Sequence, residues 1–129
     1  MKLYQLIVNL NAISRVKFTL PTHPCTWLMG RPTPGNIPEI PIPVNSVSRR
    51  LAEVKTSLNG GVPVHSIKKF PGSVNRFRIQ KSTIYINVGD SFVLQDNDVF
   101  TISNSVVWFK YSIIEDDTEV IGNAHDTLY

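Results

Sequence analysis

Cysteine is nearly absent from this chain, and so are the other features of several protein classes. The single cysteine, Cys25, excludes an internal disulfide and suits a reducing compartment, the cytosol or the nucleus. One thiol and three scattered histidines (His23, His65 and His125) argue against a zinc site. No apolar run is long enough for a membrane span, and asparagines interrupt segment 1–10, which resembles a strand more than a signal peptide. We expect no metal, no cofactor and no membrane partner.

Acidic side chains are scarce through the first two-thirds of the chain. Residues 1–81 carry 12 Lys/Arg and two Asp/Glu, a net charge of +10, whereas residues 82–129 carry one basic and eight acidic residues, a net charge of −7. A basic face with an anionic partner would account for this split. Pairing or solvation of the two halves within one sheet would account for it equally well, and charge alone leaves both interpretations open.

The motifs of common catalytic sites are missing. The sequence has no Gly-x-Ser-x-Gly elbow and no Gly-x-x-x-x-Gly-Lys phosphate loop. Glu39 and Glu53 are the only carboxylates before residue 82, which leaves few residues there for an acid–base pair. The spacing of Ser48, His65 and Asp90 gives no support to a triad. We therefore expect no enzymatic activity and no catalytic residue.

Helical periodicity is also missing, and short alternating runs take its place. Strand-like runs cover residues 4–10, 15–20, 26–30, 49–58, 62–70, 74–80, 82–88, 91–95, 99–103 and 106–114. Pro41 and Pro43 restrict the proline-rich segment 31–43 to a loop and at most an edge strand. Asn59-Gly60 between two runs predicts a tight hairpin. Roughly ten short strands predict an all-β sandwich or barrel over residues 1–114, with an acidic flexible tail or linker at 115–129.

A nucleic-acid-binding domain is one interpretation of the basic half. Arg76-Phe77-Arg78 interleaves charge with an aromatic ring, as proteins that bind single strands do. If both arginines face the solvent, however, alternation turns Phe77 toward the core. A core phenylalanine between two solvated arginines is the favoured interpretation, and nucleic-acid binding stays an alternative.

Four short motifs follow one another in an informative order. They are GR at 30–31, SRRL at 48–51, SVNR at 73–76 and INVGD at 86–90. This order resembles the forkhead-associated (FHA) domain, whose pattern runs Gly-Arg, Ser-Arg-x-His, Ser-x-Asn-Gly and Leu-x-x-Gly-Asp. The resemblance spans about residues 3–114. It implies a β-sandwich of about eleven strands, mostly antiparallel in two packed sheets, that binds phosphothreonine peptides through loops at one end.

By position, the resemblance implies a phosphopeptide-binding site formed by Arg31, Ser48, Arg49, Ser73, Val74 and Asn75. Arg31 and Ser48 would contact the phosphate or its loop, and Arg49 the phosphate or the adjacent peptide. Asn75 would hold the peptide main chain. Val74 stands where many members have Thr or Ser, so only its N–H remains. Arginine suits this task because its rigid fork matches the three acceptor oxygens of a phosphate. Each residue also fits an ordinary role in a loop or turn.

Several family positions carry other residues. Leu51 replaces the histidine that supports the binding loops, so packing must supply that support, and Arg76 replaces the glycine after Asn75. These departures motivate an alternative, a degenerate module that binds a constitutive partner without phosphate.

The resemblance also implies a cellular setting. We expect a phosphothreonine-containing partner in DNA damage or cell-cycle signalling, within a larger repair or signalling complex. The expected location is nuclear, with the cytoplasm second. In its layout the chain is also faintly similar to the N-terminal FHA domains of nibrin-type DNA repair scaffolds.

Overall fold

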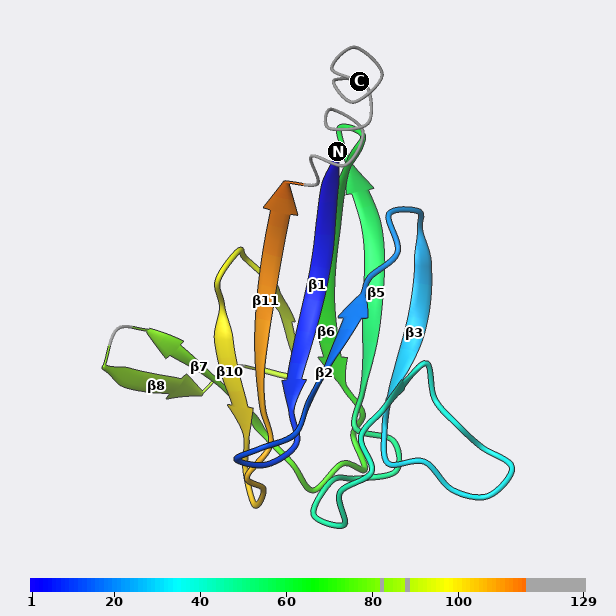
Figure 1. Cartoon of the computed structure of the whole chain (residues 1–129), viewed down its shortest axis with the longest axis vertical. Coiled ribbons are helices and arrows are strands. Elements are labelled where there is room, and N and C mark those ends of the chain that lie inside the picture. Colours follow the sequence, from blue (N-terminus) through cyan, green and yellow to red (C-terminus); the bar gives the residue numbers. More distant parts are fainter. Residues whose placement is uncertain (82, 88, 116–129) are drawn as a thin grey trace, which may run out of the picture.

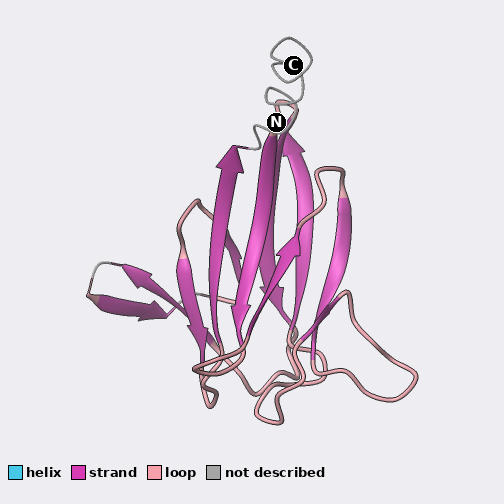
Figure 2. Cartoon of the chain, in the orientation of Figure 1, coloured by secondary structure: helices cyan, strands magenta, loops and turns pink. Residues whose placement is uncertain are grey.

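A computed structural model describes residues 1–81, 83–87 and 89–115, and these residues form strands and loops without a helix (Figures 1 and 2). The strands are β1 (Lys2–Asn9), β2 (Arg15–Thr19), β3 (Cys25–Gly30), β4 (Ile40–Pro41), β5 (Ala52–Asn59), β6 (Val62–Lys69), β7 (Phe77–Lys81), β8 (Ile84–Asn87), β9 (Ser91–Val93), β10 (Val99–Ile102) and β11 (Trp108–Glu115). The predicted all-β class is confirmed.

The strands form two packed sheets. One sheet has the order β2-β1-β11-β10-β7-β8, and the other has the order β4-β3-β5-β6-β9. Every described pair is antiparallel except β3 with β4, which is parallel. The predicted sandwich of about eleven mostly antiparallel strands is therefore confirmed. The start of β1 and the end of β11 lie at one end of the sandwich, and several connecting loops gather at the other end (Figure 1).

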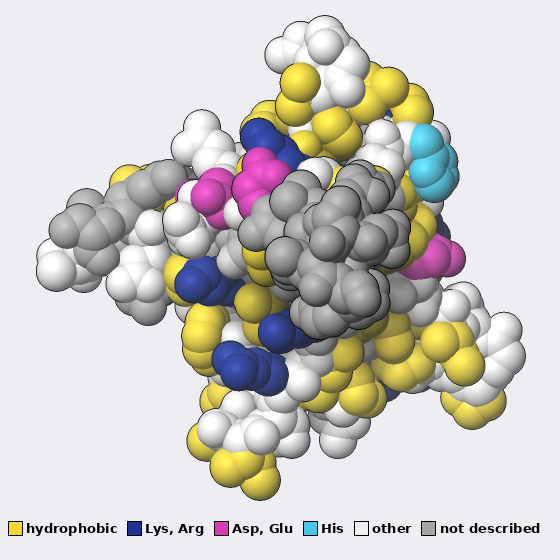
Figure 3. Space-filling model, turned by 45° about the horizontal axis from the view of Figure 1, so that its top comes forward, with side chains coloured by type: hydrophobic (Ala, Val, Ile, Leu, Met, Phe, Trp, Pro, Cys, Tyr) yellow, Lys and Arg dark blue, Asp and Glu magenta, His cyan; other side chains and the backbone are white. Residues whose placement is uncertain are grey.

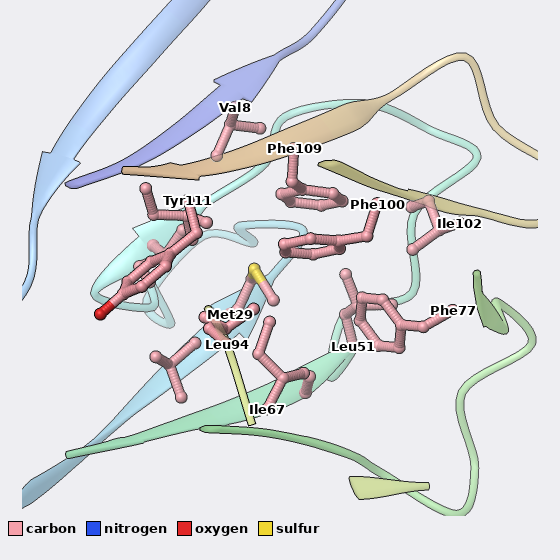
Figure 4. Packing of buried hydrophobic residues seen from close by; sticks show 14 of the residues in the cluster. Val8, Met29, Leu51, Ile67, Phe77, Leu94, Phe100, Ile102, Phe109 and Tyr111 are labelled. Carbon is pink, nitrogen blue, oxygen red and sulfur yellow. The ribbon is translucent and has the colours of Figure 1, made fainter. Parts of the chain in front are cut away.

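Side-chain alternation fills the space between the sheets. On β1, Tyr4, Leu6 and Val8 are buried, while the intervening side chains face outward. The rings of Phe100 and Phe109 stack with centroids 4.7 Å apart (Figure 4). Burial of a large apolar side chain stabilises the fold by about 1.5–3 kcal/mol, so this layer supplies much of the driving force.

The sandwich contains the tight hairpin that the sequence predicts, displaced by one residue. Asn59 pairs with Val62, so the two-residue loop is Gly60-Gly61 rather than Asn59-Gly60. Both glycines have positive φ, 60° and 82°, as a type I′ turn requires. Asn59 is thus the last residue of β5. The second glycine relieves the strain that a side chain would meet at that position.

The edge position of the proline-rich segment is confirmed. β4 is a two-residue strand at the end of its sheet, and the Ile42 N–H donates to the Gly30 carbonyl 2.8 Å away. Pro41 and Pro43 flank Ile42, so their missing donors do not face the ladder. The strand therefore pairs on one side only.

Two of the expected strands begin three residues later than predicted, and the residues before them lie in loops. The expected strand 49–58 begins at Ala52, and 74–80 begins at Phe77. Arg50, which the sequence places inside the strand-like run 49–58, therefore lies before β5, with its guanidinium carbon 4.3 Å from the Phe70 ring centroid. Phe77 is buried, as expected for a core residue between Arg76 and Arg78.

The last described strand ends close to residue 114, where the sequence places the domain boundary; the boundary itself stays a prediction. β11 runs through Glu115, one residue past the expected limit of the domain. The rest of the expected tail, 116–129, lies outside the described residues.

A buried histidine joins the two sheets. His65 on β6 lies between the rings of Tyr4 and Tyr111, with centroids 5.2 and 5.6 Å away. Its Nε2 lies 2.7 Å from the Pro21 carbonyl, which only accepts, so Nε2 carries the proton. Its Nδ1 then accepts from the Tyr111 hydroxyl, also at 2.7 Å. The neutral ring is fully bonded, and burial lowers the pKa of His65, with the Pro21 bond opposing that effect.

This lowered pKa predicts acid sensitivity. The unfolded chain takes up the histidine proton first, near pH 6.5, whereas the folded chain resists it. The stabilising contribution of His65 is thus complete above about pH 6.5 and is lost progressively as the pH falls below that value. Urea unfolding at several pH values should show this decline. His65→Gln should lower stability at neutral pH by about 1–3 kcal/mol and flatten the decline.

The matched control for this measurement is His23→Gln, since His23 is exposed. This variant should keep the decline of the unchanged protein. If His65→Gln and His23→Gln showed the same pH dependence, the buried network would not be its cause.

Candidate functional site

Three loops meet at one end of the sandwich and enclose a cavity. They are residues 31–39, 42–51 and 70–76, at the lower end of the molecule in Figure 1. The cavity has a volume of about 570 Å³ and is lined by Arg31, Asn45, Ser46, Val47, Ser48, Arg49, Arg50, Phe70, Pro71, Gly72 and Val74. Three of the residues that line the cavity are arginines, and none of them is acidic. This composition favours an anionic ligand.

Four of the six predicted site residues line the cavity, and two lie beneath it. Arg31, Ser48, Arg49 and Val74 are among the linings. Ser73 and Asn75 are buried, with Asn75 completely shielded from solvent. The structure therefore brings all six residues together but divides them into a surface layer and a supporting layer.

The supporting layer is built around the Asn75 amide. Its Oδ1 accepts from the Ser48 N–H at 2.9 Å and from the Ser48 hydroxyl at 3.0 Å. Its Nδ2 donates to the carbonyls of Ser46 at 2.9 Å and Ser103 at 2.8 Å. Both acceptor positions and both hydrogens of the amide are then in use. The Asn75 side chain is thus buried and fully bonded within the protein, and its expected contact with a peptide main chain stays a prediction.

The Ser48 hydroxyl connects the two layers. It donates to Asn75, and it accepts from the Ser73 hydroxyl at 3.2 Å and the Val74 N–H at 3.1 Å. The hydroxyl thus uses its donor and both acceptor positions within the protein. If the Ser48 hydroxyl turns away from Asn75, the Asn75 Oδ1 atom still accepts the hydrogen bond from the Ser48 backbone N–H. A ligand oxygen in the cavity can therefore receive the Ser48 O–H in exchange for one internal bond.

Arg31 is fixed against the same loop. Its backbone N–H donates to the Ser48 carbonyl at 3.0 Å, and its side-chain Nε donates to the Val47 carbonyl at 3.0 Å. Among the described residues, neither Nη group has a hydrogen-bond or ion-pair partner. The guanidinium is therefore held in place by one edge while its other donors remain available to a ligand.

The cavity wall also includes residues that were not predicted, among them Arg50, Phe70 and Pro71. Arg50 lies over the Phe70 ring, and Pro71 continues that wall. The expectation of a strand at Arg50 concealed its position, although the sequence Phe70-Pro71 signals the end of β6. A cation over an aromatic face is worth about 0.5–1 kcal/mol at an exposed site, enough to orient Arg50 along the rim.

Gly30 gives the Gly-Arg motif its structural reason. A Cβ at this position would collide with the Arg49 carbonyl oxygen, and would also approach the Leu51 nitrogen at 3.1 Å. Both neighbours are backbone, so neither side can move aside cheaply. The absence of a side chain lets β3 approach the Ser48-Arg49 turn closely enough for the Arg31–Ser48 bond.

Leu51 replaces polar support by packing. Its side chain is fully buried in the core near Met29, and its N–H donates to the Met29 carbonyl at 3.0 Å (Figure 4). The pairing of this chain segment with β3 therefore begins at Leu51, directly after the two arginines. The turn is anchored to the hydrophobic core at the position where the FHA pattern has histidine.

In the portion of the chain that the structure covers, no group of three His, Cys, Asp or Glu side chains could hold a metal ion. The same portion has no helix with the length and hydropathy of a membrane span.

Gly30→Ala should disturb the site through this contact. The added methyl would push the Arg49 carbonyl away, at a cost of about 1–3 kcal/mol in the free energy of unfolding. Thermal or urea unfolding measures the change. Gly72→Ala is the control, since a Cβ at Gly72 meets nothing within 4 Å although this residue also lines the cavity. Equal stability of the two variants would contradict the steric role of Gly30.

Asn75→Asp should reveal the role of the buried amide. The substitution keeps the shape but replaces two donors by an oxygen that faces the Ser46 and Ser103 carbonyls. We expect a loss of about 2–4 kcal/mol in unfolding free energy, from two buried acceptors left without donors. Asn45→Asp, at an exposed residue of the same cavity, should change stability by less than about 0.5 kcal/mol. A loss of similar size in both variants would exclude the proposed support.

Comparison with known proteins gives a consistent picture of the fold. No protein-family model and no curated protein matches the chain. Among solved structures, the yeast splicing factor Pml1 is similar at 15% identity and a TM-score of 0.63, over 89% of this chain and 82% of that one. The FHA domain of the CT664 protein from Chlamydia trachomatis is similar at 18% identity and a TM-score of 0.63, over 85% and 96%.

A third solved structure was determined with a ligand. It is the N-terminal FHA domain of Rad53p from S. cerevisiae in complex with a phosphothreonine peptide. Its identity is 12% and its TM-score 0.56, over 91% of this chain and 96% of that one. These likenesses confirm the predicted resemblance at the level of architecture: the chain has the fold of a divergent forkhead-associated domain.

Proposed function

We propose that this chain is a protein-interaction module that binds a phosphothreonine-containing segment of a partner protein in the loop cavity. One observation carries the proposal: the cavity is lined by three arginines and by no carboxylate. Buried hydrogen bonds hold the loops on which these residues lie. A phosphate brings a charge of about −1.5 to −2 and three acceptor oxygens. A cationic cavity with unused donors complements that group.

Each cavity residue would have a separate task. The free Nη donors of Arg31 would bind the phosphate oxygens, and the Ser48 hydroxyl would turn to donate a further bond. The Arg49 N–H has no acceptor within the described residues, so it offers a backbone donor beside them. Charge-assisted bonds contribute about 1.5–3 kcal/mol each, so two or three support micromolar affinity for a short peptide.

The apolar part of the wall supports a preference for phosphothreonine. Val74 is exposed beside the Ser48 hydroxyl, and its N–H bonds that hydroxyl. The γ-methyl group of a phosphothreonine would contact the apolar Val74 side chain, whereas phosphoserine has no methyl group at that position. Ser73 and Asn75 would act beneath the ligand by holding Ser48 in place.

The cellular role follows as part of the same proposal. Rad53p was solved with a phosphothreonine peptide, and Pml1 is described as integrated into the RES complex. We propose a nuclear phosphoprotein partner in DNA damage or cell-cycle signalling, within a larger complex. The likeness to nibrin-type scaffolds stays a prediction.

A second candidate function keeps the fold without phosphate. The Ser48 hydroxyl is saturated by its own loops, and Leu51 and Arg76 depart from the FHA pattern. A module of this kind would hold a constitutive partner through another surface. Its partner would bind equally well after phosphatase treatment.

Titration with peptide libraries tests the proposal directly. Phosphothreonine peptides should bind, and the matched threonine peptides should bind at least about tenfold more weakly. Arg31→Ala and Ser48→Ala should each weaken phosphopeptide binding by about tenfold or more, because each removes a donor to the phosphate. Isothermal titration calorimetry or fluorescence anisotropy measures these affinities.

The controls separate a lost contact from a lost fold. Lys68→Ala removes an exposed cation from the outer face of the other sheet and should leave phosphopeptide affinity unchanged. Arg31→Lys keeps the charge but loses the fork, and should recover only part of the affinity. Equal affinity for phosphorylated and unphosphorylated peptides, or binding that survives Arg31→Ala and Ser48→Ala, would refute the phosphate site and favour the constitutive alternative.

A further inference from the structure

The outer face of the six-stranded sheet carries a second basic surface, away from the loop cavity. Strand register places its side chains in two neighbouring rows. The first row contains Arg15, Asn9, Trp108, Thr101 and Arg78. The second row contains Lys17, Ile7, Lys110, Val99 and Gln80. Neither row includes a carboxylate, so four cations share one side of the sheet.

These side chains face outward because their neighbours fill the core. Val8, Phe109 and Phe100, which alternate with row members on β1, β11 and β10, are fully buried. Figure 3 shows several Lys and Arg side chains on the near face; one of them adjoins the acidic side chains of that view, and the others lie apart from acidic side chains. Among the residues described, the side chains of Arg15, Lys17 and Lys110 have no ion-pair or hydrogen-bond partner.

Protection of a sheet edge does not account for these cations. β2 is an edge strand, where lysine and arginine discourage pairing with other chains. Lys110, however, lies on β11, between β1 and β10 in the interior of the sheet. Its register neighbours are Ile7 and Val99, neither of which carries a charge, so its own charge has no counterpart on the adjacent strands. An anionic ligand would compensate that charge.

An exposed aromatic ring lies among the cations. Trp108 is 41% exposed on an interior strand, which is unusual for so large an apolar side chain. A hollow of about 320 Å³ lies on one side of it, lined in part by Val99, Thr101 and Trp108 itself. On the other side, a hollow of about 180 Å³ is lined in part by Asn9 and Arg15. The Asn9 amide nitrogen is buried without a hydrogen-bond acceptor.

We propose that this sheet face binds single-stranded nucleic acid, with a base stacked on Trp108 and the phosphates on Arg15, Lys17 and Lys110. Proteins that bind single strands combine a cationic track with aromatic platforms, because every base has a face that can stack. From β2 to β7 the rows cross four strand spacings, about 19 Å, which accommodates a few nucleotides. An acidic peptide would match the cations but has no use for the exposed ring, so the ring favours nucleic acid.

Anisotropy titrations with labelled oligonucleotides test this surface. Oligo-U and oligo-dT of about 12 nucleotides serve as probes, with a duplex as comparison. Arg15→Gln/Lys17→Gln should lower the slope of log K against log salt by about 1.4, as expected for two lost single-strand phosphate contacts. Trp108→Ala should weaken binding by about tenfold, whereas Trp108→Tyr should keep most of it.

A matched pair of lysines on the opposite face provides the control. Lys55→Gln/Lys68→Gln removes the same charge from the five-stranded sheet and should change neither slope nor affinity appreciably. Arg31→Ala, in the loop cavity, should also leave oligonucleotide binding intact, so this result is independent of the phosphopeptide proposal.

Three results would overturn the assignment. The first is no binding of any probe at about 50 mM salt, where counterion release favours binding most. The second is an equal effect of the double variants on the two faces. The third is polyglutamate binding that depends on Arg15 and Lys17 but is unaffected by Trp108→Ala, which would identify an acidic protein segment as the ligand.

Discussion

The loop end of this sandwich depends on one buried primary amide. The Asn75 side-chain amide binds the backbone of Ser46, Ser48 and Ser103, and all of its hydrogen-bond donors and acceptors are in use. Because Arg31 bonds the same Val47–Ser48 segment, the position of the cationic fork follows from that amide as well. The buried Asn75 amide therefore determines the shape of the cavity. Each hydrogen bond that it lost would leave a buried polar partner unsatisfied and would lower the stability of the fold.

Much of the fold is predictable from the sequence because alternation is a local property. Phe77 between two arginines, the glycine hairpin after β5 and the proline-limited edge strand all follow from single-residue rules. The role of Asn75 is different, since its partners come from segments 27 to 29 residues away. An amide both donates and accepts, so its residue type does not reveal whether it faces a ligand or its own loops. Motif order predicts a candidate site, and only the fold separates its residues into a surface layer and a supporting layer.

Leu51 shows how a departure from a family pattern can preserve geometry. A histidine at this position would support the loops through polar contacts, whereas leucine anchors the same turn to the hydrophobic core. The polar support is supplied instead by Ser48, Ser73 and Asn75. The site is consequently tied to core packing. Changes in the interior that leave every cavity lining untouched would still alter the position of the arginines.

The uneven charge of the sequence resolves into separate surfaces on the fold. Arg31, Arg49 and Arg50 surround the loop cavity, while Arg15, Lys17 and Lys110 lie on the face of a sheet. Lys110 comes from the acidic half of the chain, so counting charge along the sequence assigned it to the wrong region. Cations brought together without carboxylates repel one another and cost stability. Solubility does not require cations to gather in two places, because charges of either sign would serve it, whereas the two anionic ligands proposed above would require it.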